Sequence, residues 1–362
     1  MANKPIGGRR RAHVVDVRTL TDDQRRIWRD LTLQSPDASP FLGPAFAEAA
    51  AMSLAVFAAF VFEDNRVVAV FPFQFPDAFH RLLGAAERVG GELSDRAGIV
   101  AVPDFRITAP ELLTLARLRS FLFTHLSQGE IDRGLTGEKP EIGLVIDFAE
   151  GAEAFWAERR RSDVRFVRDT ERRKRRLEAD LGPIRFVPHA VDPSAALQSL
   201  IKAKRAQYRR TGVGDPFDIH WANSLLQALS GCVQPECTAV LSSLYAGDTW
   251  IASHFGLRCR DTLHYWFPVY NPEAHKVAPG RLLLAATIDA AAVLGIRRID
   301  RGQGDSPSKR DFATGEQRFW RGLWYRPGIR SFCYRVERGL RWKLEARRRR
   351  PASAVEAPTT EG

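Results

Sequence analysis

The pattern of apolar and polar positions divides the chain into two rounds of similar elements. In the first round, residues 22–35 carry apolar side chains at helical spacing, which predicts an amphipathic helix. Two apolar runs within residues 54–75 meet at a short polar turn and predict a β-hairpin. Residues 39–51 start a second helix after prolines, a further helix is predicted over residues 108–126, and a closing strand is predicted over residues 141–148.

The second round follows an arginine-rich stretch, residues 153–182, which predicts one long helix ended by Gly182. This helix has two interpretations, a solvated connection between two domains or a basic wall beside an anionic ligand. The elements predicted after it are a strand, two helices, three antiparallel strands, an apolar helix and a final strand, at residues 184–190, 194–212, 220–231, 237–247, 248–260, 261–271, 280–295 and 296–300.

Both rounds place helices before an antiparallel meander that ends in a strand, helix, strand unit. The expected fold class is therefore α/β (α+β), with two related modules in tandem, each a mixed, mainly antiparallel central sheet flanked by helices. The predicted divisions are a basic tail, a first module, a basic connecting helix, a second module and a second basic tail, at residues 1–13, 14–150, 151–182, 183–335 and 336–362.

One apolar run, residues 45–62, approaches the length of a membrane span. It contains Glu48 and leads directly into another predicted strand, so the end of a helix followed by a buried hairpin explains it better. The first residues of the chain are basic but have no apolar stretch behind them, and we expect no secretory signal and a cytoplasmic location.

Charge favours anionic partners, because 54 Lys and Arg residues stand against 43 Asp and Glu residues, a formal net charge of +11 in 362 residues. Part of this excess lies at the two ends, where solvated tails are the simpler interpretation. The four cysteines show neither CxxC spacing nor nearby histidine ligands. They predict reduced thiols and no metal site.

The junction between the last meander strand and the apolar helix predicts an anion site. Pro279, Gly280 and Arg281 form this turn, and the helix is expected from Leu282 onward. Backbone N–H groups and the positive end of a helix dipole bind anions, and glycine lets a phosphate approach closely. Glycine and proline are also common in ordinary turns from strand to helix, so the signal is weak by itself.

Four motifs in a fixed order strengthen the prediction of an anion site at this turn. They are a glycine-containing hairpin, an aromatic strand, a Pro-Gly-x-Leu-Leu helix start and an acidic loop with a lysine. The matching residues are Gly247, Ile251, Ala252, His254, Gly256 and Leu257, then Tyr265 and Trp266, then Pro279, Gly280, Leu282 and Leu283, and finally Asp300, Gly304, Asp305 and Lys309.

With these motifs the chain resembles acetyltransferases of the CelD/BcsL type in the GNAT superfamily, which are often named for cellulose or exopolysaccharide biosynthesis. The resemblance is good over residues 152–313 and looser before them, which implies two GNAT-like modules of which the first is degenerate. Ser308 departs from the pattern, because an aromatic residue usually precedes the lysine.

The resemblance implies an N- or O-acyltransferase that uses an acyl-CoA, most simply acetyl-CoA, as co-substrate, and no metal. The acceptor would be a saccharide, a lipid-linked saccharide or an amino acid, with a role in the cell envelope and peripheral association through the basic tails. The expected cofactor-binding residues are Pro279, Gly280, Arg281, Leu282 and Leu283. Trp266 and Tyr270 would line the acceptor side.

Catalysis by such an enzyme needs a base for the acceptor and a group that stabilises the oxyanion. His254 and Asp300 are the first candidates for the base, with Asp305 behind them, and Lys309 is the candidate for neutralising negative charge. Three of them also have a structural interpretation. His254 would be a core histidine, Asp300 a carboxylate that caps its loop, and Lys309 a surface lysine.

Three other functions compete with this one. The tandem arrangement also resembles Fem-type aminoacyl transferases, which use aminoacyl-tRNA, and the arginine-rich helix would suit tRNA phosphates. A non-catalytic polyanion-binding protein would explain the net charge. A P-loop nucleotidase is excluded, because Ser308 and Arg310 flank Lys309 where glycine and Ser or Thr are required.

Overall fold

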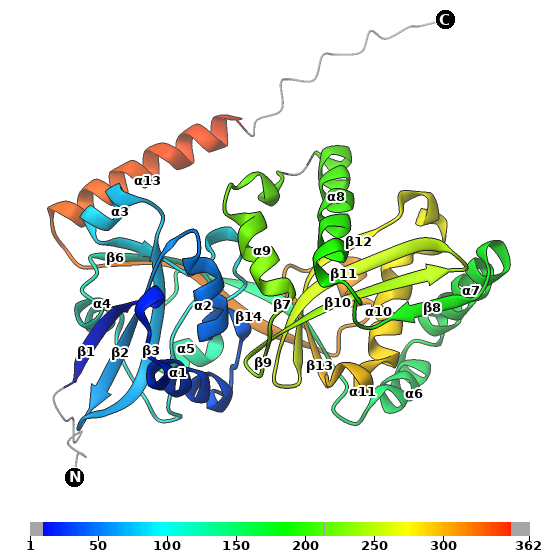
Figure 1. Ribbon diagram of the computed structural model, residues 1–362, viewed down its shortest axis with the longest axis horizontal. Coiled ribbons are helices and arrows are strands. Elements are labelled where there is room, and N and C mark those ends of the chain that lie inside the picture. Colours follow the sequence, from blue (N-terminus) through cyan, green and yellow to red (C-terminus); the bar gives the residue numbers. More distant parts are fainter. Residues whose placement is uncertain (1–9, 213, 349–362) are drawn as a thin grey trace, which may run out of the picture.

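The structure is a computed structural model that describes residues 10–212 and 214–348, with side chains up to residue 338. Two halves lie side by side, joined by long strands that cross the middle of the molecule (Figure 1). The strands are β1 (Arg11–Asp16), β2 (Ala55–Glu63), β3 (Arg66–Phe75), β4 (Ala85–Glu87), β5 (Val100–Ala101), β6 (Ser120–Ser127), β7 (Lys139–Asp147), β8 (Ile184–Val187), β9 (Val233–Gln234), β10 (Cys237–Ala246), β11 (Thr249–Cys259), β12 (Thr262–Tyr270), β13 (Arg298–Gln303) and β14 (Gly315–Tyr325).

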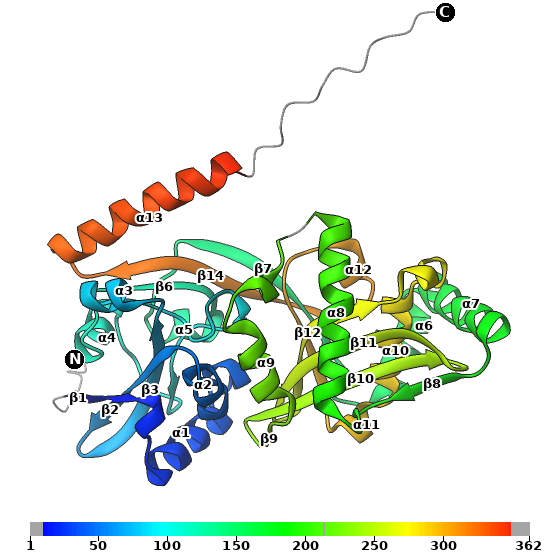
Figure 2. The same cartoon turned by 45° about the horizontal axis from the view of Figure 1, so that its top comes forward.

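Helices flank the sheet in both halves (Figure 2). The α-helices are α1 (Asp22–Gln34), α2 (Pro44–Ala51), α3 (Ala78–Leu83), α4 (Ala109–Leu115), α5 (Gln128–Asp132), α6 (Ala152–Ser162), α7 (Val164–Leu181), α8 (Pro193–Thr211), α9 (Ala222–Ser230), α10 (Pro279–Asp289), α11 (Ala291–Leu294), α12 (Pro307–Arg310) and α13 (Ile329–Arg348). Short 3-10 helices are η1 (Val17–Thr19), η2 (Pro40–Leu42), η3 (Gly91–Leu93), η4 (Pro216–Asp218) and η5 (Pro272–Val277).

All the longer strands belong to one continuous sheet, in the order β1-β2-β3-β4-β6-β14-β7-β13-β12-β11-β10-β8. The two halves of this order correspond when each is read inward from its end of the sheet. The strands β1, β2, β3, β4 and β6 then match β8, β10, β11, β12 and β13. Each half also contains one parallel pair, β4 with β6 and β12 with β13, in an otherwise antiparallel arrangement. The expected α/β fold with tandem, mixed, mainly antiparallel modules is confirmed.

The last strand of each round pairs with the other half. β7 comes from the first round but pairs with β13 of the second, and β14 comes from the second round but pairs with β6 of the first. The two exchanged strands also pair with each other along their length, from Gly315 opposite Val145 to Arg321 opposite Lys139. Because of this exchange, neither half completes its sheet without a strand from the other.

Two predicted helices have other structures. Residues 108–126 were expected to be one helix, but α4 ends at Leu115, Arg117 has φ of +58° and the remainder is β6. Pairing with β4 and β14 overrides the local helical pattern, as tertiary context commonly does. The expected single helix over 153–182 is two helices, because Asp163 has a non-helical backbone conformation that separates α6 from α7. Its side chain caps α7 by accepting a hydrogen bond from the Phe166 N–H.

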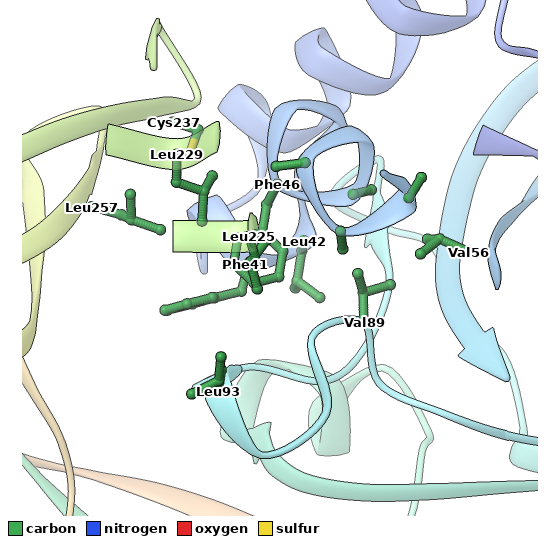
Figure 3. Packing of buried hydrophobic residues seen from close by; sticks show 14 of the residues in the cluster. Phe41, Leu42, Phe46, Val56, Val89, Leu93, Leu225, Leu229, Cys237 and Leu257 are labelled. Carbon is green, nitrogen blue, oxygen red and sulfur yellow. The ribbon is translucent and has the colours of Figure 1, made fainter. Parts of the chain in front are cut away.

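The largest apolar core spans both halves. Figure 3 shows Phe41 and Phe46, from the first half, packing beside Leu225 and Leu229 of α9, from the second half. Separate cores lie on the other face of the sheet, one in each half. The halves are therefore held together by both shared strands and shared apolar packing.

Other expectations concern the ends and the apolar run. Residues 45–62 contain nearly all of α2 followed by the strand β2, so the predicted helix before a strand is confirmed, and no helix within the described ranges is long and apolar enough to cross a membrane. Of the two expected basic tails, residues 1–9 and 349–362 lie outside the described residues, residues 11–13 belong to β1 and residues 336–348 belong to α13.

Candidate functional site

The parallel strands β12 and β13 separate into a fork. They pair only where Thr262, Leu263 and His264 lie opposite Arg298, Ile299 and Asp300, although both strands continue beyond these residues. Tyr265 and Arg301 are the first residues past the last pair. Separated strands leave backbone and side chains open to a ligand between them, and two cavities meet at this point.

The first cavity lies between the fork and the N-terminus of α10 and has a volume of about 400 Å³. Its lining includes the first turn of α10 and residues from α8, β12 and β13, among them Lys204, Gln207, Tyr270, Pro279, Gly280 and Arg281. A Cβ atom added at Gly280 would meet nothing within 4 Å, so the backbone there faces open space. The helix N-terminus and its uncrowded glycine suit an anionic ligand such as a phosphate.

Charges around this first cavity are partly compensated. Arg281 bonds to Asp169 of α7 at 2.9 Å and to Asp311 at 2.8 Å, and it stacks on the ring of Phe166. Its role in the structure is to anchor α10 to α7. Lys204 is a further cation on the lining, where burial lowers its pKa to about 8 and its ammonium donates to the Pro268 carbonyl oxygen at 2.8 Å.

The second cavity lies between the two halves of the molecule and has a volume of about 420 Å³. Glu92, Leu93, Asp95 and His125 of the first half form one side of it. Residues of β12, β13 and the following loop form the other side: Tyr265, Trp266, Phe267, Arg301, Gly302, Gln303, Gly304 and Lys309.

Tyr265 and Arg301 line both cavities. The Tyr265 hydroxyl and the Arg301 Nη1 atom are buried and have no hydrogen-bond partner among the described residues. Burial raises the pKa of the Tyr265 phenol and lowers that of the Arg301 guanidinium. Buried donors are rarely left unpaired, so these two atoms are candidates for hydrogen bonding to a ligand.

His254 lies behind this pair and lines neither cavity. Its imidazole is fully buried and stacks on the Tyr265 ring, with centroids 4.0 Å apart and planes 6° from parallel. Burial, followed by the charge of Arg301, lowers its pKa to about 3. Gly256 makes room for it, because a Cβ there would approach Nε2 to 2.6 Å.

Asp300 is buried and accepts hydrogen bonds from three directions. Its donors are Arg96 of the first half at 2.5 Å, Gln317 of β14 at 2.7 Å and the Gly302 N–H at 2.8 Å. Burial alone would raise its pKa, but Arg96, His264 and these bonds outweigh burial and hold the pKa well below its usual range. Its position suits a carboxylate that joins the two halves.

The loop residues Asp305 and Lys309 have different surroundings. Asp305 is exposed and pairs with Arg310 through two contacts of 2.5 Å, which lower its pKa, and it lines neither cavity. Lys309 lines the cavity between the halves and donates to the Gln303 carbonyl oxygen at 2.7 Å. Burial, with a contribution from Arg301, lowers its pKa.

The remaining predicted residues divide between cavity and core. Trp266 lines the cavity between the halves and packs edge-on against Phe41, with centroids 5.2 Å apart, while Tyr270 lines the cavity beside α10. Leu282 and Leu283 are buried on the inner side of α10 and belong to the core of the second half. Of the five expected cofactor-binding residues, the first three therefore face the cavity beside α10.

Sequence reasoning assigned no role to several residues of the site. Arg301 and Tyr265 have a local signal, since they follow the paired ends of neighbouring strands. Asp95 and His125 have none, because they belong to the first half and reach the site only through the folded sheet. No group of three or more metal-ligating side chains occurs within residues 10–212 and 214–338.

Residues 165–310 match the family model described as "Acetyltransferase (GNAT) domain". A comparison with curated protein sequences finds no significant match.

Three solved structures are similar in fold. FemX is 9% identical with a TM-score of 0.61, covering 90% of this chain and 99% of its own. A conserved protein of unknown function from Bacteroides thetaiotaomicron is 10% identical with a TM-score of 0.51, covering 84% and 98%. The C-terminal domain of a putative lysylphosphatidylglycerol synthetase from Agrobacterium fabrum is 11% identical with a TM-score of 0.50, covering 84% and 92%. At these identities the likeness concerns the fold alone.

Proposed function

We propose that the protein is an acyl-CoA-dependent acyltransferase that transfers an acyl group, most simply acetyl, to an amine or hydroxyl. The observation that carries this proposal is the fork of β12 and β13, where Tyr265 and Arg301 line both cavities and leave buried donor atoms unpaired. The match of residues 165–310 to a GNAT acetyltransferase domain supports the same class of reaction.

The donor is assigned to the cavity beside α10. A coenzyme A molecule carries phosphates and a long pantetheine arm, and the N-terminus of α10 offers an amide at Gly280 and the positive end of the helix dipole. Lys204 adds a cation to the lining. The thioester at the end of the arm would then reach Tyr265 and Arg301 at the fork.

The acceptor is assigned to the cavity between the halves, where Trp266 forms part of the wall. Holding acceptor and thioester together removes much of the entropic barrier to reaction. As the acceptor attacks, negative charge develops on the carbonyl oxygen, and Tyr265 and Arg301 are placed to donate hydrogen bonds to it. The mixed polar and aromatic lining suits a saccharide or an amino acid, in line with a role in exopolysaccharide or cell-envelope biosynthesis.

The donor assignment is tested by titrating acetyl-CoA and coenzyme A into the protein by calorimetry. Gly280→Glu projects a carboxylate into open space at the first turn of α10, where it favours the helix but repels a phosphate. We expect wild-type protein and the matched control Gly280→Ala to bind, and Gly280→Glu to bind at least tenfold more weakly with an unchanged Tm. Wild-type protein that binds neither ligand would contradict the proposed donor.

A Fem-type aminoacyl transferase is the second candidate. The specific observation in its favour is the exposed basic face of α7, where Arg172, Lys174, Arg175 and Arg176 point to solvent. Lysine and arginine contacts to phosphates make nucleic-acid binding strongly dependent on salt. Tight, salt-sensitive binding of charged tRNA, together with no binding of acetyl-CoA, would favour this candidate over the first.

A further inference from the structure

The first half of the molecule contributes to the cavity in which the acceptor is placed. Asp95 and His125 lie on its lining, opposite Tyr265, Arg301 and Lys309 of the second half. Asp95 reaches as far as β13, because a Cβ added at Gly302 would lie 3.5 Å from its carboxylate. The carboxylate therefore stands at the boundary of the two halves, beside the fork.

Asp95 is held in this place by its neighbours in the chain. The next residue, Arg96, forms the buried 2.5 Å ion pair with Asp300 and stacks on the Phe319 ring of β14. On the other side, the Ala97 N–H donates to the His125 carbonyl oxygen at 3.2 Å, which ties the two segments together. These contacts fix the backbone of Asp95 and leave its side chain facing the cavity.

His125 has a backbone conformation that side chains rarely adopt, with φ of +58°. Such strained conformations are concentrated at functional sites. Its Nδ1 contacts the Thr124 hydroxyl at 2.8 Å, and its Nε2 lies 3.7 Å from an oxygen of Asp95. Burial, followed by the charges of Arg88 and Arg96, lowers its pKa to about 3, so the imidazole is neutral and can orient the carboxylate but not serve as a strong base.

Asp300, Asp305 and Asp95 differ in their free lone pairs, and the exposed Glu92 is a second carboxylate on the lining of the cavity between the halves. Asp300 accepts three hydrogen bonds, and Asp305 is paired with Arg310. No described residue donates a hydrogen bond to the Asp95 carboxylate, whose side chain keeps 27% of its surface exposed. A base must have an oxygen that is free to receive the proton, and Asp95 meets this condition.

We propose that Asp95 is the general base that accepts the proton of the acceptor nucleophile, and that His125 is a positioning residue for it. This inference rests on the proposed acyltransferase function. The acceptor N–H or O–H attacks the thioester carbonyl carbon, a C–N or C–O bond forms, and the proton passes to Asp95. The C–S bond then breaks, the coenzyme A thiolate leaves, and Asp95 returns its proton to water.

The electrostatic surroundings agree with this role. Burial and the charge of Asp300 raise the pKa of Asp95 to about 6, while Arg96, Arg88 and Lys309 oppose the rise. A base with a pKa near neutrality is ionised at pH 7–8 and still basic enough to take a proton. The rate with an acceptor should therefore fall as the pH drops through about 6.

The test compares two nucleophiles in a thiol-release assay with acetyl-CoA. Hydroxylamine attacks thioesters without help from a base at neutral pH, whereas water requires one. We expect Asp95→Asn to bind acetyl-CoA within twofold of wild type, to lose about 100-fold in hydrolysis, and to lose less than fivefold with hydroxylamine. Asp132→Asn, an exposed carboxylate on α5 outside both cavities, is the control and should match wild type in both reactions.

Two further variants separate a chemical role from a structural one. Asp95→Glu keeps the carboxylate and should retain the acidic limb of the pH profile for hydrolysis, which Asp95→Asn should lack. His125→Gln should shift the acidic limb of this pH profile, because the imidazole that orients Asp95 is lost. Binding of acetyl-CoA should stay unchanged. Equal losses with both nucleophiles in Asp95→Asn, or no loss at all, would overturn the assignment of the base. Wild-type protein that binds no acetyl-CoA would overturn the proposed function, and with it this assignment.

Discussion

At the scale of single residues, Tyr265 and Arg301 combine two features. Both line the two cavities, and each carries a buried polar atom without a hydrogen-bond partner among the described residues. An unpaired buried donor costs free energy, and natural proteins keep such groups where a ligand will satisfy them. Packing of His254 against the Tyr265 ring fixes the hydroxyl in place.

Tyr265→Phe separates stability from activity at this position. It removes the hydroxyl but keeps the ring that stacks on His254. Because no described partner loses a hydrogen bond, we expect the free energy of unfolding to stay the same or to rise by about 1 kcal/mol. The rate of acyl transfer should fall about 100-fold, the usual effect of removing one oxyanion donor.

Urea unfolding and thiol-release assays on the same preparation measure both quantities. Trp266→Phe, which changes a neighbouring wall residue of the same cavity without altering a buried hydroxyl, is the comparison. A Tyr265→Phe protein that is less stable but fully active would contradict the role assigned to the hydroxyl.

At the scale of elements, helix α5 supports the segment that presents Asp95. Glu130 of α5 is 3% exposed, and one of its oxygens accepts a hydrogen bond from the Ile99 N–H at 3.2 Å. Gly98 lies against this side chain, because a Cβ there would approach the Glu130 carboxyl carbon to 2.6 Å. Burial raises the pKa of Glu130 to about 8, so the carboxyl group is protonated at neutral pH.

This raised pKa makes stability depend on pH with a known sign. Between the unfolded pKa of about 4 and the folded pKa of about 8, the native state holds one proton more than the unfolded chain. The contribution of Glu130 to the free energy of unfolding is fully present below pH 4 and is lost as the pH rises through 8. Between these values it decreases by at most about 1.4 kcal/mol per pH unit.

Glu130→Gln mimics the protonated group at every pH. We expect the stability of this variant relative to wild type to increase from pH 5 to pH 8 and then to level off. Thermal or urea unfolding across that range measures it, with Asp132→Asn on the same helix as the exposed control. A difference that does not vary with pH would show that the Glu130 carboxyl is not buried in its protonated form.

At the scale of the whole molecule, the exchange of β7 and β14 makes the two halves depend on each other. β6 would have an unpaired edge without β14, and β13 would have one without β7. The largest apolar core also contains side chains from both halves. Domains linked only by a flexible connection unfold in separate steps, whereas this arrangement couples them.

We therefore expect one cooperative unfolding transition. Far-ultraviolet circular dichroism and the fluorescence of single-tryptophan variants, with Trp28 as the reporter in the first half and Trp221 in the second, should give coincident urea curves. A chain that ends at residue 314 lacks β14 and should fail to show this transition, while a chain that ends at residue 348 should keep it. Two separated transitions in the full chain would contradict the coupling.

Much of the fold could be predicted because it depends on local patterns. Thr21 and Gln24 form a capping box at the start of helix α1. The hairpin of β2 and β3 turns at Asp64 and Asn65, which both have positive φ. The predictions for residues 108–126 and 153–182 were wrong where partners distant in sequence, or a single capping residue, decided the backbone conformation.

Half of the candidate site could be predicted in the same way. The start of α10 at Pro279 and the loop from Asp300 to Lys309 are continuous stretches with recognisable composition, and both lie at the fork. The sequence did not show which of their side chains line a cavity, because burial depends on what packs against them. His254 and Asp300 are enclosed, whereas Tyr265 and Arg301 line both cavities.

The sequence by itself determined the element types, the tandem α/β architecture and the helix start that suits an anion, because hydrophobic periodicity, caps and turn residues act over a few neighbouring positions. Only the tertiary structure decided that β7 and β14 exchange halves and that Asp95 faces Lys309 across a cavity. Strand pairing and apolar burial bring together residues about 200 positions apart, such as Arg96 and Asp300, and no local pattern encodes such a contact.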